Sequence, residues 1–100
     1  MDKYSVQLMP RARRDLEGIY AYIANTLLER GTAEDTIDAL EAALFSLEEL
    51  PRRCAERKRG IYADRGYRQL FIKNYTIVFR IDEERKRVIV VTVRYSRSNF

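Results

Sequence analysis

Apolar and polar residues alternate along three runs in the last third of the chain, which is the spacing of β-strands with one buried face. The first run holds Leu70 and Ile72, and the last holds two interleaved apolar sets within residues 88–93. The middle run has its apolar positions at Tyr75, Ile77, Phe79 and Ile81. Residues 73–74 and 82–86 separate the runs with turn-forming side chains, so the pattern predicts three consecutive strands joined by hairpins.

The first half of the chain changes from strand spacing to helix spacing. Tyr4, Val6 and Leu8 alternate with polar residues and predict a short strand, and Pro10 suits the first turn of a helix. Apolar residues then recur every three or four positions, as on one face of an amphipathic helix. The first such set is Leu16, Ile19, Tyr20, Ile23 and Leu27. The second set is Ile37, Leu40, Leu44, Leu47 and Leu50, which predicts a second helix.

The link between these helices is expected at Gly31 and Thr32. Gly31 suits the left-handed residue that closes a helix, and Thr32 with Asp35 resembles a capping box for the next one. So short a link makes the two helices an antiparallel hairpin. The order is then βααβββ, and we expect one α+β domain over residues 1–100, with the helical hairpin packed on a mainly antiparallel β-sheet. The pattern leaves open which edge of the sheet the N-terminal strand takes.

Composition narrows the class of protein. A chain of 100 residues with 46% hydrophobic content fits a single domain with one core. Its net charge of +4 favours an acidic partner such as nucleic acid or an acidic protein. The single cysteine, Cys54, excludes an internal disulfide and favours a reducing cytoplasm. No apolar run approaches the roughly 20 residues that span a bilayer, and the first residues do not resemble a signal peptide. We therefore expect a cytoplasmic protein.

The absence of histidine excludes several kinds of chemistry. Triads built on Ser–His or Cys–His pairs are impossible, and a zinc site is improbable with one cysteine and no histidine. The four glycines are scattered, so no glycine-rich phosphate loop is present. We expect no metal and no cofactor.

Charge is segregated between two neighbouring segments. Residues 32–50 hold six acids and no base. Residues 51–68 hold two acids and seven bases: Arg52, Arg53, Arg57, Lys58, Arg59, Arg65 and Arg68. A long basic connection in so small a domain is typical of a contact loop, while the alternative is a solvated connection whose charges keep the protein soluble.

The order of these elements, together with four short segments, resembles the RelE/ParE superfamily of type II toxin–antitoxin toxins. The segments are PRARRDLEGIYAYIA, GYRQL, NYTIVFRID and VRYSRSNF. The resemblance implies a small toxin in a hetero-oligomer with an antitoxin, whose C-terminal segment wraps the toxin's helices and sheet. From the basic loop and the first helix we expect the antitoxin to contact Arg52, Arg53, Arg57, Leu16 and Tyr20.

The superfamily contains ribosome-dependent mRNA endonucleases and gyrase inhibitors, and the resemblance helps to separate them. The basic position on the GYRQL strand is kept as Arg68, but a second basic position falls on Leu70 and an expected arginine falls on Thr76. Arg97 keeps a basic position near the end, and Tyr95 lies close to where the nucleases place an aromatic residue. Arginine cannot act as a conventional base. The pattern is therefore more similar to ParE-like toxins, which act by binding DNA gyrase.

The expected target-binding surface consists of the basic loop and the end of the chain, with Arg68, Arg94, Tyr95, Arg97 and Phe100. The expected function is a non-enzymatic gyrase inhibitor that an antitoxin neutralises. One alternative is a metal-independent mRNA endonuclease using Arg68, Tyr95 and Arg97, with the ribosome and mRNA as partners. Another is a non-toxic relic that only binds antitoxin. Because residues 94–100 carry few apolar groups, we expect their removal to cost little stability.

Overall fold

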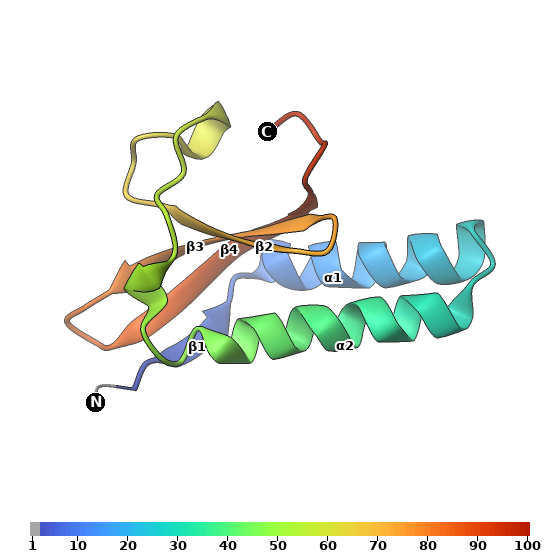
Figure 1. Ribbon diagram of the computed structural model, residues 1–100, viewed down its shortest axis with the longest axis horizontal. Coiled ribbons are helices and arrows are strands. Elements are labelled where there is room, and N and C mark those ends of the chain that lie inside the picture. Colours follow the sequence, from blue (N-terminus) through green and yellow to red (C-terminus); the bar gives the residue numbers. More distant parts are fainter. Residues whose placement is uncertain (1–2) are drawn as a thin grey trace.

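A computed structural model of the protein describes residues 3–100 and contains one four-stranded sheet (Figure 1). The strands are β1 (Ser5–Leu8), β2 (Arg68–Ile72), β3 (Tyr75–Asp82) and β4 (Arg87–Tyr95), in the order β1-β4-β3-β2. The predicted antiparallel meander of β2, β3 and β4 is confirmed. β1 forms the edge beside β4 and runs parallel to it, with Ser5 opposite Arg87 and Leu8 opposite Val90.

Two helices form the predicted hairpin on one face of this sheet (Figure 1). They are α1 (Pro10–Ala21), which continues into a π-helical turn at Tyr22–Thr26, and α2 (Arg30–Ser46). The prediction that Gly31 closes the first helix is wrong, because Gly31 lies in the first turn of α2. The left-handed residue of the link is Leu28, with φ of 58°, since the wide π turn ends the first helix before Gly31 is reached. The Thr32 hydroxyl donates to Glu29 at 3.3 Å instead of pairing with Asp35.

The core lies between the helices and the sheet, and a β-bulge sets which residues of β4 enter it. Val78 pairs with Thr92, but the next residue, Phe79, pairs with Val90, so Val91 is the extra residue. The bulge explains the two interleaved apolar sets of β4. Even-numbered residues such as Val90 face the core before it, and the odd-numbered Val93 faces the core after it. The buried core residues are Ala12, Leu40, Leu44, Leu47, Cys54, Ile77, Phe79, Val88, Val90 and Val93.

The segment between α2 and β2 leaves the helical layer and returns along the outer edge of β2. It contains two short 3-10 turns, Pro51–Arg53 and Gly60–Tyr62. Backbone hydrogen bonds join Gln69 N to Ala55 O and Arg57 N to Tyr67 O, at 3.0 and 2.8 Å. Figure 1 shows this segment and the end of the chain rising from the sheet away from the helices. No helix within residues 3–100 combines the length and apolar character needed to cross a membrane.

Candidate functional site

Two arginines of the basic segment hold parts of the fold together. Arg53 Nη1 donates to the carbonyl oxygens of Glu49 and Leu50 in the turn after α2, at 2.8 and 3.1 Å, and to Ser46 O at the end of α2, at 3.3 Å. Arg52 Nη2 forms an ion pair with Glu83 Oε2 at 2.6 Å. Both residues were predicted to bind antitoxin. Their guanidinium groups are exposed, but each already has partners within the chain.

Glu83, in the turn between β3 and β4, binds Arg52 of the basic segment and thereby links that segment to Tyr4, next to the N-terminal strand. Its carboxylate also accepts from Lys86 Nζ at 3.0 Å and from the Tyr4 hydroxyl at 2.9 Å. The hydrogen bonds from Lys86, Arg52 and Tyr4 lower the pKa of Glu83 to about 2. This cluster is a structural anchor, because its only acid is fully engaged by its neighbours.

Arg68, the basic residue kept on β2, is half-buried and directed toward the backbone. Its Nη1 donates to Cys54 O at 2.6 Å and more weakly to Arg52 O at 3.4 Å. Cys54 itself is buried, and burial raises the pKa of its thiol despite the nearby charges of Arg53 and Arg68. A neutral buried thiol is a poor nucleophile, so Cys54 acts as a core residue.

The last residue of the chain is buried against the basic segment. Phe100 is only 7% exposed, and the guanidinium carbons of Arg57 and Arg94 lie 4.2 and 5.2 Å from the centre of its ring. Gly60 makes room for it: a Cβ at Gly60 would lie 1.7 Å from the Phe100 carbonyl oxygen. Phe100 is therefore a packing residue in this conformation. The sequence analysis predicted that removing the tail would cost little stability; the burial of Phe100 and its two cation–π contacts lead us to expect a larger cost.

Tyr95 also packs onto the sheet. Its ring meets the ring of Tyr75 edge-to-face at 5.9 Å, and 43% of the residue stays exposed. Burial raises the pKa of the Tyr75 hydroxyl, with smaller contributions from Tyr95 and Tyr22. Tyr95 is thus held by the Tyr75 ring and remains partly exposed, as a contact residue would be.

Arg57, predicted to bind antitoxin, is 4% exposed. Its Nε donates to Arg59 O at 3.0 Å, Nη1 to Gln69 Oε1 at 2.9 Å and Nη2 to Phe100 O at 3.3 Å. Burial lowers the pKa of Arg57, and the charge of Arg59 lowers it further. An antitoxin could reach Arg57 only if the tail moved.

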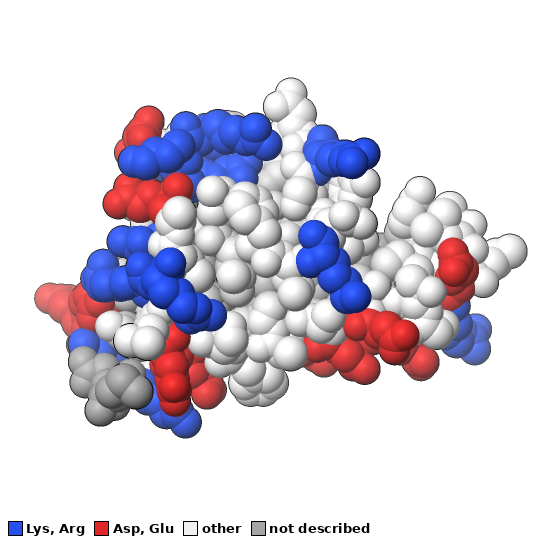
Figure 2. Space-filling view, in the orientation of Figure 1, with Lys and Arg blue, Asp and Glu red and all other residues white. Residues whose placement is uncertain are grey.

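Arg57 forms part of the wall of a polar pocket of about 300 Å³ between the basic segment and the tail. Its lining residues are Arg57, Arg59, Gly60, Ser96, Arg97, Ser98, Asn99 and Phe100. Figure 2 shows basic side chains gathered over the segment before β2, and acidic ones along the helical layer. We call this the basic pocket. It brings Arg97 and Phe100 of the predicted target surface together with Arg57 of the predicted antitoxin surface.

Among the three nuclease candidates, Arg68 is not brought together with Tyr95. Arg68 pairs with Phe79 at one end of β2, whereas Tyr95 pairs with Tyr75 at the other, about 13 Å away along the strands. Arg97, two residues after Tyr95 in the chain, lines the basic pocket. The position of the missing phosphate-binding arginine is filled by Thr76, which is buried with its hydroxyl 2.7 Å from Ser96 Oγ.

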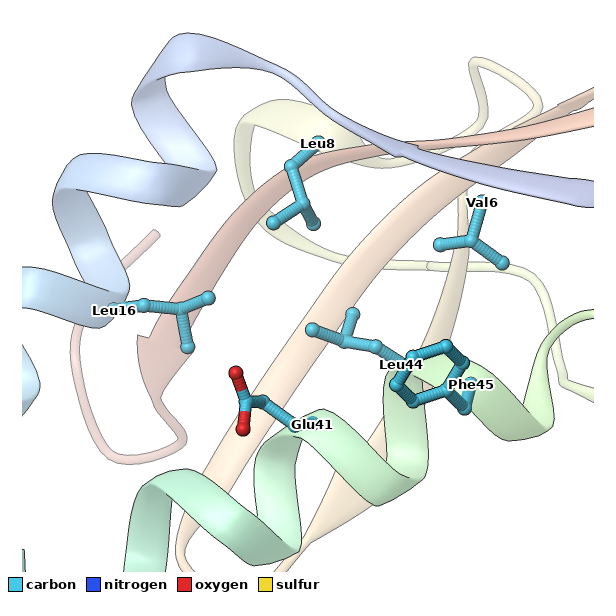
Figure 3. A pocket seen from close by; sticks show the side chains of 6 residues that line it. All are labelled: Val6, Leu8, Leu16, Glu41, Leu44 and Phe45. Carbon is cyan, nitrogen blue, oxygen red and sulfur yellow. The ribbon is translucent and has the colours of Figure 1, made fainter. Parts of the chain in front are cut away.

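A second candidate surface is apolar and lies where β1 meets the two helices (Figure 3). This apolar pocket, of about 200 Å³, is lined by Val6, Leu8, Leu16, Glu41, Leu44 and Phe45. Leu16 was predicted to bind antitoxin, and Tyr20 lies on the same helix outside the lining. The sequence analysis missed Phe45, which is 69% exposed although aromatic. Its position beside the apolar stripe of α2 was the available signal.

Comparison with known proteins places this fold. The sequence model of the ParE toxin of the type II toxin–antitoxin system parDE matches residues 6–100. The structure resembles a chromosomal ParDE toxin–antitoxin system from P. aeruginosa, with a TM-score of 0.77, 18% identity and coverage of 95% of this chain and 98% of the other. It also resembles the RelBE2 toxin–antitoxin complex from Mycobacterium tuberculosis, with a TM-score of 0.69, 23% identity and coverage of 93% and 98%.

A mutant of the E. coli toxin RelE in the free state is similar as well, with a TM-score of 0.64, 18% identity and coverage of 95% of this chain and 85% of the other. No curated protein sequence matches the chain. The solved structures named above share the fold of this chain, and the family model matches nearly every residue. The chain belongs to the ParE toxin family of type II toxin–antitoxin systems.

Proposed function

We propose that this protein inhibits growth by binding DNA gyrase, without cleaving RNA, and that a cognate antitoxin neutralises it. The family membership supports the toxin assignment. The observation that carries the choice of mechanism is the dispersal of the nuclease positions. Leu70 and Thr76 carry no positive charge for a phosphate, and Arg68 lies at the opposite end of the paired strands from Tyr95, which speaks against joint action of these two side chains on one ribose hydroxyl.

The gyrase-binding surface is proposed at the end of β4 and the tail. Tyr95 and Arg97 are exposed there, and Arg94 is half-buried beside them over Phe100. Aromatic and arginine side chains on rigid supports are typical hot spots of protein interfaces. Arg68 is a weaker member of this surface than the sequence indicates, because its guanidinium faces the backbone of the basic segment.

The antitoxin is proposed to bind in the apolar pocket. Solved structures with this fold include toxin–antitoxin complexes, which supports such a partner. An apolar groove beside a helical hairpin suits one face of an amphipathic helix. Phe45 and Leu16 would receive its apolar side chains, and Glu41 would pair with a basic residue. Arg52 and Arg53 remain exposed for acidic residues of the partner, whereas Arg57 does not.

The test compares induced expression of the chain with and without the adjacent reading frame that would encode the antitoxin. We expect growth arrest, relaxed plasmid DNA and intact mRNA, together with inhibition of purified gyrase in a supercoiling assay. Arg97→Ala should abolish inhibition in a folded protein, and Arg13→Ala, an exposed change on α1, should not. Rapid mRNA cleavage on ribosomes would contradict this proposal and favour an mRNA endonuclease. Normal growth together with retained antitoxin binding would instead favour a non-toxic protein that only binds antitoxin.

A further inference from the structure

Thr92 is a fully buried polar residue of β4 whose hydroxyl has a partner on each side. The hydroxyl donates to Asp15 Oδ2 in α1, and it accepts from Arg94 Nε, two residues further along the strand, at 3.1 Å. The direction of both bonds is fixed, because the same Asp15 oxygen also accepts the backbone N–H of Val93 and a guanidinium nitrogen only donates. Asp15, Thr92 and Arg94 therefore form one directed chain of hydrogen bonds from the helix to the arginine.

Arg94 is held at two points of its side chain and is open at its end. Its Nε is bonded to Thr92, and its guanidinium carbon lies 5.2 Å from the centre of the Phe100 ring. The terminal nitrogens, Nη1 and Nη2, have no hydrogen-bond partner in residues 3–100, and neither of them is buried. The half-buried side chain thus offers two free donors to a partner from a supported position.

The second arginine of the proposed gyrase surface lacks this support. Arg97 is exposed, and no hydrogen bond, ion pair or ring contact within residues 3–100 restrains its side chain. A long arginine side chain loses rotamer freedom when it binds, and one that is already held in a single conformation loses less. The hydrogen bonds behind Arg94 therefore make it the better prepared of the two arginines for a partner.

We infer that Thr92 is a positioning residue for Arg94. Asp15 orients the Thr92 hydroxyl, and the hydroxyl in turn holds the guanidinium so that Nη1 and Nη2 face the target. This inference rests on the proposed function, because the proposed gyrase surface includes Arg94. It adds to that surface a fully buried residue, Thr92, which does not touch the target itself.

The first test follows the Nε–H signal of Arg94 in proton–nitrogen NMR spectra of the purified chain without any partner. Arg94→Lys, which lacks this group, assigns the signal. Thr92→Val keeps the size of the side chain and removes the hydroxyl, so the Nε proton should exchange with water about fivefold faster, as expected for the loss of one hydrogen bond. Thr92→Ser keeps the hydroxyl and should leave the exchange rate nearly unchanged.

The second test measures inhibition of purified gyrase in a supercoiling assay. Thr92→Val should raise the concentration for half inhibition about three- to tenfold, because the arginine must then be ordered on binding. Thr92→Ser should not, although the loss of its buried methyl group lowers stability. Thr36→Val on α2 is the control, since Thr36 is also a buried threonine but has no bond to Arg94. It should change neither the Nε exchange nor the inhibition.

Each outcome decides a separate part of the inference. Unchanged Nε exchange in Thr92→Val would overturn the positioning of Arg94. Faster exchange with undiminished inhibition would overturn its importance for the target. Inhibition that followed the urea midpoints of the three threonine variants would reduce Thr92 to a stabilising residue and would also overturn the inference. If the unaltered chain did not inhibit gyrase, the proposed function would fall and with it the role at this target, while the exchange measurement would still decide whether Thr92 positions Arg94.

Discussion

The carboxylate of Asp15 in α1 accepts a hydrogen bond from the backbone N–H of Val93 in β4, at 3.1 Å. The same oxygen accepts the hydroxyl of Thr92, a fully buried side chain. β1 pairs with β4 only as far as Val90, so beyond that point no strand formed by residues 3–100 lies next to β4 on this side. Asp15 supplies the acceptor that a strand would otherwise provide, and it fixes α1 against the sheet edge.

Asp15→Ala should therefore destabilise the protein more than most helix-surface changes do. It leaves a backbone N–H and a buried hydroxyl without their acceptor, a loss of about 1 to 3 kcal/mol in the free energy of unfolding. Asp15→Asn, which keeps one acceptor oxygen, should lose less. Urea unfolding of both variants measures this, with Glu17→Ala on the same helix as the control. A cost for Asp15→Ala no larger than for Glu17→Ala would contradict the role of this contact.

Gly60→Ala should displace the end of the chain. Both Gly60 and Gly66 have positive φ, at 78° and 83°, so an alanine at either position carries a similar backbone penalty of roughly 1 kcal/mol. Only at Gly60 would the new Cβ collide with Phe100. Hydrogen exchange of residues 96–100 should accelerate in Gly60→Ala and stay unchanged in Gly66→Ala. Unchanged exchange in both variants would mean that the tail is not held by this contact.

Stability should fall in acid partly through Glu83. Its pKa drops from an ordinary 4.5 to about 2 in the folded protein, so its contribution is complete above pH 4.5 and disappears as the pH falls toward 2. Glu83→Gln should flatten the decline of the urea midpoint over this range. Part of the decline of the urea midpoint should remain in this variant, because the pKa of Asp82 is also lowered, by Arg87 and Arg85. Glu84 is an exposed neighbour and serves as the control. If Glu84→Gln flattened the decline of the urea midpoint as much as Glu83→Gln, the prediction for Glu83 would be contradicted.

Phe45→Ser should weaken antitoxin binding without unfolding the protein. Phe45 is 69% exposed, so its loss costs the free protein little, while an aromatic anchor in an interface contributes about 2 kcal/mol or more, a factor of about 30 in affinity. Phe71→Ser on β2 is the matched control, because Phe71 is 60% exposed and lies outside the apolar pocket. The measurement is the affinity of each variant for the antitoxin from the adjacent reading frame. Comparable losses in the two variants would place the antitoxin elsewhere.

The elements that depend on local periodicity could be predicted from the sequence. The meander follows from the alternation of residues such as Ile77 and Phe79, and the helices follow from the spacing of Leu40 and Leu44. The link between the helices was misplaced because a π turn leaves no signature in apolar spacing. Nothing local distinguishes Leu28 as its left-handed residue.

The candidate site was harder to predict, because the role of each arginine depends on partners far away in the sequence. Arg52 meets Glu83 and Arg57 meets Phe100, contacts that composition and charge runs do not encode. The sequence correctly indicated a basic segment. It could not show which of its charges the fold uses internally and which, such as Arg59, stay exposed at a pocket.

The pairing of β1 with β4 has a consequence for how the toxin is made. Ser5 can pair with Arg87 only after Arg87 has been synthesised. The edge of the sheet, and the surface on which α1 packs, therefore stay incomplete until β4 leaves the ribosome. At 5–20 residues per second this interval lasts roughly 4 to 16 s. During it the apolar stripes of the helical hairpin have no sheet to cover them. The incomplete chain therefore exposes apolar surface that an antitoxin could bind before the sheet is complete.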